Sequence, residues 1–315
     1  MPINSPDIFC YSIVVEPEAS IASNDKFDAI GDIVPIAGVN CKTGFQSGIL
    51  DEFPGASAGF SLRRLTKNYL GPCIKVQKQG GSTLDIGFDQ DGNLDTASML
   101  TFAGATGTLD IDTWYDQSGN GYNLTQPELS KQPAIVLGGK LQLANGKPCV
   151  DFNDSGQNHL LNTGELMTGA GMCHVLQTRC ESFIASGGFM FIVDQSGPDF
   201  GGAVHINDSE TQISFARFNS QFVANNSSAS ALNYSTVVSN FVSGGSSIRV
   251  NDTVSTDSET FSGSGNTGET FFMGGDSNTA NRFFDGIIQE YIYYNEPQTD
   301  LDGLRDNLNA YYNTF

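Results

Sequence analysis

The stretch WYDQSGNG, residues 114–121, follows an alternating apolar run at 109–115 and constrains the fold more than any other part of the sequence. Gly119 and Gly121 accept positive φ angles without steric cost, and the Asp, Ser and Asn side chains around them bond nearby backbone groups. We therefore expect a strand that ends in a tight, structural turn.

A second interpretation of the same stretch is a rim that binds carbohydrate. Two aromatic side chains stand beside planar polar groups, and aromatic rings with a polar neighbour suit the mixed surface of a sugar. The candidate carbohydrate-binding residues are Trp114, Tyr115, Asp116 and Asn120. The sequence leaves both interpretations open.

Short apolar segments recur at fairly regular spacing after this stretch, separated by Gly, Asn, Asp and Ser. The expected strands are 134–137, 148–152, 189–194, 212–218, 236–242, 247–250, 270–273 and 286–294. With 36 glycines and only 16% charged residues, the composition favours strands joined by tight turns over a helical bundle. The pattern predicts a mainly β, two-sheet antiparallel jelly-roll sandwich over about residues 100–296.

A few short helices are expected beside the sandwich. Leu62, Leu65 and Tyr69 share one helical face, which predicts a helix near 58–69. The last helix is expected at 300–312, with Thr299 and Asp302 as its capping box. Its buried stripe is expected to contain Leu301, Leu304, Leu308 and Tyr311.

A hairpin and another helix are expected between 73 and 102. Strands at 73–77 and 82–88 flank Gly80-Gly81, a turn pair. The loop around Asp91-Gly92 alternates acidic and amide residues, but it lacks the glycine and glutamate positions of an EF-hand. We interpret it as a hairpin turn, with Asp95 as the N-cap of a helix that ends near 102.

The chain is strongly acidic, with 15 Lys and Arg against 35 Asp and Glu and a net charge of −20. This charge repels phosphate backbones and anionic lipid, so nucleic acid is not an expected partner. No apolar run reaches about 18 residues, and no basic segment precedes the apolar run at 8–15. We expect synthesis in a cytosol without a signal peptide, and no membrane insertion.

Cysteines and acidic groups indicate no metal centre or other cofactor. The six cysteines show no CxxC spacing, which argues against zinc. Cys173 and Cys180 are candidates for a small disulfide-closed loop under oxidising conditions, a pairing that the sequence does not decide. Calcium is kept open only because the chain is rich in carboxylates.

Residues 1–52 differ from the rest and are expected to form an extended attachment or oligomerisation arm, with the jelly roll at 53–315. Five prolines between positions 2 and 54 interrupt the apolar runs 8–15 and 30–39. These runs are too apolar to remain solvated and need a cover. The cover is either the chain's own sandwich or another protein.

Three ordered stretches carry a resemblance to a known family. They are FSLRRL at 60–65 with IKV at 74–76, DIGF at 85–88 with LDT at 94–96, and WYDQSGNG with Gln126 and Gln132-Pro133. Together they resemble the opening half of a concanavalin A-like family of bacterial and bacteriophage structural proteins. YDQSGNG also occurs in the catalytic domain of fungal α-L-arabinofuranosidases. The resemblance covers about residues 56–155, and FDGIIQEYIYY at 284–294 resembles the closing strand of laminin-G-like jelly rolls more loosely.

The resemblance implies the fold but no catalytic residues. The paired adjacent cysteines of the arabinofuranosidases are missing, and so is their Asp-Leu-Glu-Asn-type nucleophile segment. The carboxylates left as candidates for a glycosidase are Asp194, Asp199, Glu210, Asp285 and Glu290. We therefore expect a non-enzymatic protein, with a glycoside hydrolase as the alternative.

The same resemblance implies a bacteriophage virion protein: a head decoration or fibre, a tail fibre, or a baseplate component. Its expected location is the virion, and its expected partners are capsid or tail proteins and copies of itself. The jelly roll would face the host and bind its surface glycans. A bacterial surface lectin-like adhesin is a second alternative, although such proteins usually carry a secretion signal.

Overall fold

The computed structural model describes residues 44–153, 155–164, 166–167, 171–182, 189–195, 203–207, 213–217, 221–226, 232–242, 244–257, 270–275 and 282–315. Contacts divide the chain into the unit Met1–Gln46 and the unit Ser47–Phe315. The second unit is a mainly β, antiparallel structure with three α-helices among its described residues.

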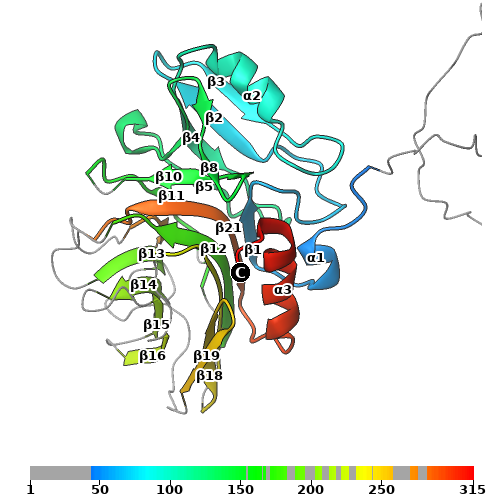
Figure 1. The fold of residues 1–315 in the computed structure, drawn as a ribbon, viewed down its shortest axis with the longest axis vertical. Coiled ribbons are helices and arrows are strands. Elements are labelled where there is room, and N and C mark those ends of the chain that lie inside the picture. Colours follow the sequence, from blue (N-terminus) through cyan, green and yellow to red (C-terminus); the bar gives the residue numbers. More distant parts are fainter. Residues whose placement is uncertain are drawn as a thin grey trace, which may run out of the picture. The chain divides into compact units, whose positions relative to one another are not determined.

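The first sheet is built on the long strand β21, which is fully buried along its length. The pairing order is β19–β18–β17–β12–β21, with β1 and β10 on the other side of β21. Figure 1 shows β12 and β21 side by side at the centre of the molecule. The strands are β1 (Ala58–Ser61), β10 (Val150–Phe152), β12 (Met172–Cys180), β17 (Ser235–Phe241), β18 (Ser246–Val250), β19 (Thr253–Asp257) and β21 (Gly286–Tyr294).

The second sheet pairs in the order β16–β15–β14–β13–β20–β11–β5–β4–β2–β3. Its strands are β2 (Ile74–Lys78), β3 (Thr83–Ile86), β4 (Leu109–Trp114), β5 (Leu124–Thr125), β11 (Leu160–Asn162), β13 (Phe189–Gln195), β14 (Ala203–Asn207), β15 (Ile213–Arg217), β16 (Gln221–Asn226) and β20 (Phe271–Met273). The predicted hairpin is confirmed in β2 and β3, and Gly80 and Gly81 have the expected positive φ.

Strand β6 (Ala134–Leu137) joins the two sheets, because it pairs with β4 on one side and with β10 on the other. The short strands β7 (Lys140–Leu141), β8 (Leu143–Ala144) and β9 (Lys147–Pro148) follow it. The junction places residues of β4 and β10 on either side of one strand.

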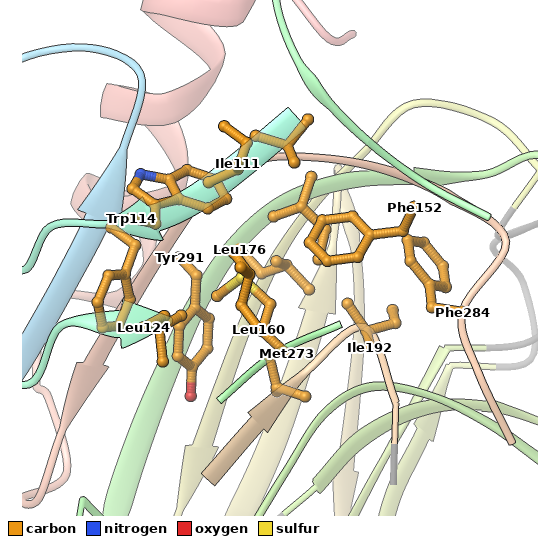
Figure 2. Close-up of a cluster of buried hydrophobic side chains, with 14 of the residues drawn as sticks. Ile111, Trp114, Leu124, Phe152, Leu160, Leu176, Ile192, Met273, Phe284 and Tyr291 are labelled. Carbon is orange, nitrogen blue, oxygen red and sulfur yellow. The ribbon is translucent and has the colours of Figure 1, made fainter. Parts of the chain in front are cut away.

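Aromatic side chains fill the space between the sheets. Phe60 of β1 lies edge-on to Trp114 of β4 and stacked on Tyr291 of β21, each at 6.5 Å between ring centroids. Such pairs contribute about 1 kcal/mol each beyond the apolar area they bury. Figure 2 shows Trp114, Leu124 and Tyr291 in this core.

The helices are α1 (Ile49–Glu52), α2 (Thr96–Ala103) and α3 (Leu301–Tyr312), with a 3-10 turn at Leu129–Lys131. Asp95 caps α2 as predicted, and its carboxylate accepts the backbone N–H of Ser98. The cap of α3 differs from the prediction, because Asp300 rather than Thr299 accepts the N–H of Gly303. Tyr312 is buried in the stripe of α3, whereas Tyr311 is only half-buried.

The helix predicted near 58–69 is wrong. Ala58–Ser61 forms β1 and pairs with Tyr293–Glu290 of β21, and the backbone N–H of Leu65 bonds Gln117 Oε1. Leu62 and Leu65 are buried as expected, but their segment takes its hydrogen bonds from distant parts of the chain. Pairing with the central strand therefore overrides the local helical pattern.

The boundary between the units lies at Gln46 and Ser47 rather than at 52 and 53. Ile49 and Leu50 of α1 are buried in one cluster with Leu304 and Leu308 of α3, so α1 belongs to the jelly roll. Figure 1 shows the two helices beside each other. The attachment arm falls almost wholly on residues 1–43, which lie outside the described residues, and it stays a prediction.

Cys173 and Cys180 do not pair. Both lie on β12, where seven residues span about 23 Å, far beyond the roughly 7 Å between Cα atoms that a disulfide allows. Cys73, Cys149, Cys173 and Cys180 are all buried free thiols. Burial raises the pKa of Cys149 and of Cys180 to about 12, which makes both thiols unreactive.

Candidate functional site

The turn after Trp114 is a structural clamp. The buried carboxylate of Asp116 accepts backbone N–H groups of Gly59 at 2.9 Å, Ser118 at 2.8 Å and Tyr122 at 3.0 Å. Gln117 donates to the carbonyl of Ser61. The turn therefore fixes β1 against β4, and the structural interpretation of WYDQSGNG describes its geometry.

The four residues predicted to bind sugar do not form one rim. Trp114 is 0% exposed and lies in the core, so it offers no face to a ligand (Figure 2). Asp116 is 4% exposed, and its oxygens are already bonded. Tyr115 donates its hydroxyl to Asp85, and Asn120 donates to the carbonyl of Ser57. Trp114 and Asp116 are thus excluded, while sugar binding at Tyr115 and Asn120 stays a prediction.

An open hollow of about 780 Å³ lies over β6, where the two sheets join. Its size falls within the usual range of small-molecule sites, about 300–1,000 Å³. We call it the β6 hollow. Among the residues that line it are the polar Gln79, Asp110, Gln132, Asp151, Asn153 and Asn158. Leu129, Ala134 and Leu137 supply apolar surface.

Two carboxylates face each other across the β6 hollow. Asp110 of β4 and Asp151 of β10 are both register partners of Ala134. Directly opposite residues of an antiparallel pair point to one face of the sheet, so the three side chains share a face. The two Cα atoms are separated by two strand spacings, about 10 Å. A register shift between Leu109 and Asp110 creates this alignment.

Neither carboxylate has a hydrogen bond or an ion pair with any described residue, although the side chains of both are partly buried. Burial raises the pKa of Asp110 to about 6. Burial, reinforced by Glu181 and Asp285, also raises the pKa of Asp151 to about 6, against the effect of Arg179. Such groups cost stability when charged and cluster at functional sites.

Gln132 adds a third unused acceptor. Its side chain is 3% exposed and lines the β6 hollow, and its Oε1 has no hydrogen-bond partner. Its Nε2 donates to Gln77 Oε1 at 2.8 Å and to the carbonyl of Gln126 at 2.7 Å, which fixes the amide. The unbonded charged groups of the hollow are both acceptors, which suits a ligand that brings donors.

The carboxylates singled out for a glycosidase that lie in the described residues have separate structural surroundings. Glu290 is fully buried and forms an ion pair with Arg63, with 2.7 Å between Oε2 and Nε. Asp285 accepts the hydroxyl of Ser182, and Asp194 is buried on β13. Asp199 and Glu210 lie outside the described residues.

The sequence analysis missed Asp110 and Asp151. Each is a lone acid between apolar residues, in LDIDTW and in VDF, which places it on the outer face of a strand. That alternation was a usable signal for exposure. It carried no information that β6 brings the two acids together.

The described residues contain no group of three or more His, Cys, Asp or Glu side chains arranged to hold a metal ion. In the acidic loop, Asp89 accepts the N–H groups of Asp91 and Asn93, and Gly92 has a positive φ. The loop is therefore the predicted hairpin turn. None of the described helices is long and apolar enough to cross a membrane.

No family model and no curated protein matches the sequence. Among solved structures, the chain is similar to an arabinofuranosidase complexed with arabinofuranosyl-α-1,2-xylobiose, with a TM-score of 0.61 and 18% identity over 82% of this chain. A mutant GH54 α-L-arabinofuranosidase soaked with 4-nitrophenyl α-L-arabinofuranoside gives 0.63 and 17% over 82%. This chain covers 64% of the length of both.

These similarities show the fold, a concanavalin A-like jelly roll, and confirm the predicted fold class. A Trypanosoma rangeli sialidase in complex with sialic acid is more distant, with a TM-score of 0.41 and 12% identity over 62% of this chain and 30% of the sialidase. At this TM-score the sialidase does not contribute to the assignment of the fold. The bacteriophage part of the sequence resemblance stays a prediction.

Proposed function

We propose that the protein is a non-catalytic, carbohydrate-binding jelly roll displayed on a bacteriophage particle. The observation that carries the binding function is the pair of unbonded carboxylates that line the β6 hollow, Asp110 and Asp151, beside the buried and unbonded amide oxygen of Gln132. Sugar hydroxyls donate hydrogen bonds to such groups, and bonds to ionised acceptors are about twice as strong as neutral ones.

The apolar part of the hollow also suits a sugar ring. Leu129, Ala134 and Leu137 lie beside the carboxylates, and Leu137 is 41% exposed. A pyranose or furanose ring presents C–H groups on its faces and hydroxyls at its edge. The ring would cover the apolar residues while its hydroxyls reach Asp110 and Asp151.

A glycan array followed by calorimetric titration tests the binding function. We expect binding that weakens by about tenfold or more in Asp110→Asn and in Asp151→Asn, as for the loss of a charged hydrogen bond. Asp112→Asn is the matched control, because Asp112 lies two residues from Asp110 on β4 and does not line the hollow. Equal loss in the control, or no loss in either variant, contradicts the assignment of the site.

The virion location rests on the sequence resemblance to bacteriophage proteins and on the apolar runs of residues 1–43. Immunogold labelling of purified particles tests it directly. A deletion of residues 1–43 should leave a folded jelly roll that no longer incorporates into particles or oligomers. A deletion to residue 50 should also lose stability, because it removes Ile49 and Leu50 from the core. Unfolding after the shorter deletion would show that the arm covers the protein's own sandwich.

Glycoside hydrolysis is the second candidate, and the pair Asp110 and Asp151 is what favours it. Inverting glycosidases use two carboxyl groups about 6.5–9.5 Å apart, which side chains on alternate strands can reach. Against hydrolysis, the two pKa values rise to the same level of about 6, whereas an acid and a base need values pushed apart. Release of reducing sugar from oligosaccharides that disappears in Asp151→Asn would favour the enzyme.

A further inference from the structure

The charges around the β6 hollow are predominantly negative. Asp110 and Asp151 have no ion-pair partner among the described residues, and Glu181 and Asp285 lie close enough to raise the pKa of Asp151 further. The cation near this group is Arg179. Arg179 is already engaged, because it bonds the carboxylate of Glu181 and the hydroxyl of Tyr234.

A second cation near the hollow is engaged in the same way. Lys131 follows Leu129 on the 3-10 turn, and its Nζ lies 2.8 Å from Glu128 Oε2. Burial raises the pKa of Asp110, and no cation forms an ion pair with this carboxylate among the described residues. A negatively charged sugar would therefore be repelled, and a positively charged one attracted.

We infer that the glycan bound in the β6 hollow carries a free amino group, as in oligomers of glucosamine. This rests on the proposed function and names its ligand class. An ammonium group brings three donors, and the two unbonded charged groups that line the site, Asp110 and Asp151, are both acceptors. The hydroxylated ring then covers Leu129 and Leu137.

The inference predicts a dependence on pH. At pH 7 both carboxylates are largely ionised because their pKa is about 6, and an amino sugar, whose ammonium is more acidic than that of lysine, still carries its proton in a substantial fraction of molecules. At pH 5 the carboxyl groups are mostly protonated and lose their attraction for an ammonium. The charged groups that act on Asp151 are Glu181, Asp285 and Arg179, and its pKa of about 6 already includes their effect.

Calorimetric titration with a glucosamine tetramer and an N-acetylglucosamine tetramer tests the inference on the full chain. At pH 7 and low salt we expect the amino sugar to bind about tenfold tighter or better, with this preference lost at pH 5 and reduced by salt. Asp110→Asn and Asp151→Asn should each lower the preference, and Asp112→Asn should keep it. Circular dichroism checks that each variant is folded.

The outcomes separate the inference from the proposed function. Equal affinity for the two tetramers overturns the amino-sugar inference and leaves carbohydrate binding in place. Spermidine binding as tightly as the glucosamine tetramer also overturns it, because the site would then recognise an amine without a sugar. If no oligosaccharide binds at either pH, both the inference and the proposed function are wrong.

Discussion

Two polar regions of this molecule, the turn that follows β4 and the β6 hollow that contains Asp110 of β4, differ in whether their polar side chains are bonded. In the clamp, the side chains of Asp116, Gln117, Ser118 and Asn120 all make hydrogen bonds to strand β1 or its flank. In the β6 hollow, Asp110 and Asp151 make none with the described residues. Buried polar groups are normally satisfied, so the unsatisfied region is the one that indicates a ligand.

The largest expected effect comes from breaking the clamp at its centre. Asp116→Ala removes the acceptor of three backbone N–H groups, those of Gly59, Ser118 and Tyr122. Leaving a buried donor unsatisfied costs about 1–3 kcal/mol, and partial access of water reduces the sum. We expect a loss of about 3 kcal/mol or more in the free energy of unfolding, measured by urea denaturation.

Asp112→Ala is the control for this change. It removes a nearby carboxylate that, among the described residues, accepts only the hydroxyl of its neighbour Thr113 and lies 3.9 Å from Lys75 in a partly exposed contact. We expect a loss below about 1 kcal/mol. Similar losses in the two variants would show that the clamp is not what holds β1 to β4.

Gln117→Ala should have a smaller effect. Its amide also connects the turn after β4 to the segment that begins with β1. It donates to the carbonyls of Ser61 and Arg63 and accepts the N–H of Leu65. We expect a loss of about 2 kcal/mol in the free energy of unfolding, since the freed carbonyls tolerate an unmade bond better than an N–H does. Gln117→Glu is a more specific test, because it keeps the acceptor for Leu65 but places a negative charge against two carbonyls. We expect its free energy of unfolding to be no higher than that of Gln117→Ala.

The fold was predictable because strand spacing is a local signal. The strand predicted at 286–294 coincides with β21, and the turn chemistry of Gly80-Gly81 holds. Strand β12 was missed because its sequence MCHVLQTRC mixes polar and apolar residues, although His174 and Gln177 are both buried. Their hydrogen bonds to Tyr291 and Thr236 come from other strands and are invisible in the local pattern.

The candidate site was not predictable for a related reason. Asp110 and Asp151 are far apart in the chain and meet only because β6 lies between their strands and a register shift turns Asp110 toward Ala134. The aromatic residues of WYDQSGNG led the sequence analysis to predict the binding site at the turn after β4 instead. A polar motif in the sequence indicates that its side chains have a specific role. The hydrogen bonds in the structure decide whether that role is in folding or in binding.

Replacing a carboxylate of the hollow should stabilise the folded protein, whereas replacing a side chain of the clamp should destabilise it. A carboxyl group whose pKa is raised by folding binds more protons in the folded state between about pH 4 and pH 6, so its contribution to stability falls as pH rises through this window. Asp151→Asn should therefore unfold at a higher temperature than the wild type at pH 7 and at the same temperature at pH 4. We expect a gain of roughly 1 kcal/mol at pH 7, discounted for solvent screening. A destabilised variant at pH 7 would mean that Asp151 has a partner in the folded protein.

The smallest expected effect concerns the two carboxylates together. If Asp110 and Asp151 face one hollow, each ionised group raises the cost of the other, and replacing one relieves part of that cost. The double variant Asp110→Asn/Asp151→Asn should then gain less stability at pH 7 than the sum of the single variants. Coulomb's law at about 8 Å in a water-rich site sets the shortfall at about 0.5 kcal/mol, smaller in high salt. A double-mutant cycle by thermal denaturation at low and high salt measures it. Strict additivity at low salt would show that the two groups do not share the hollow, and the carbohydrate site would then need another pair of acceptors.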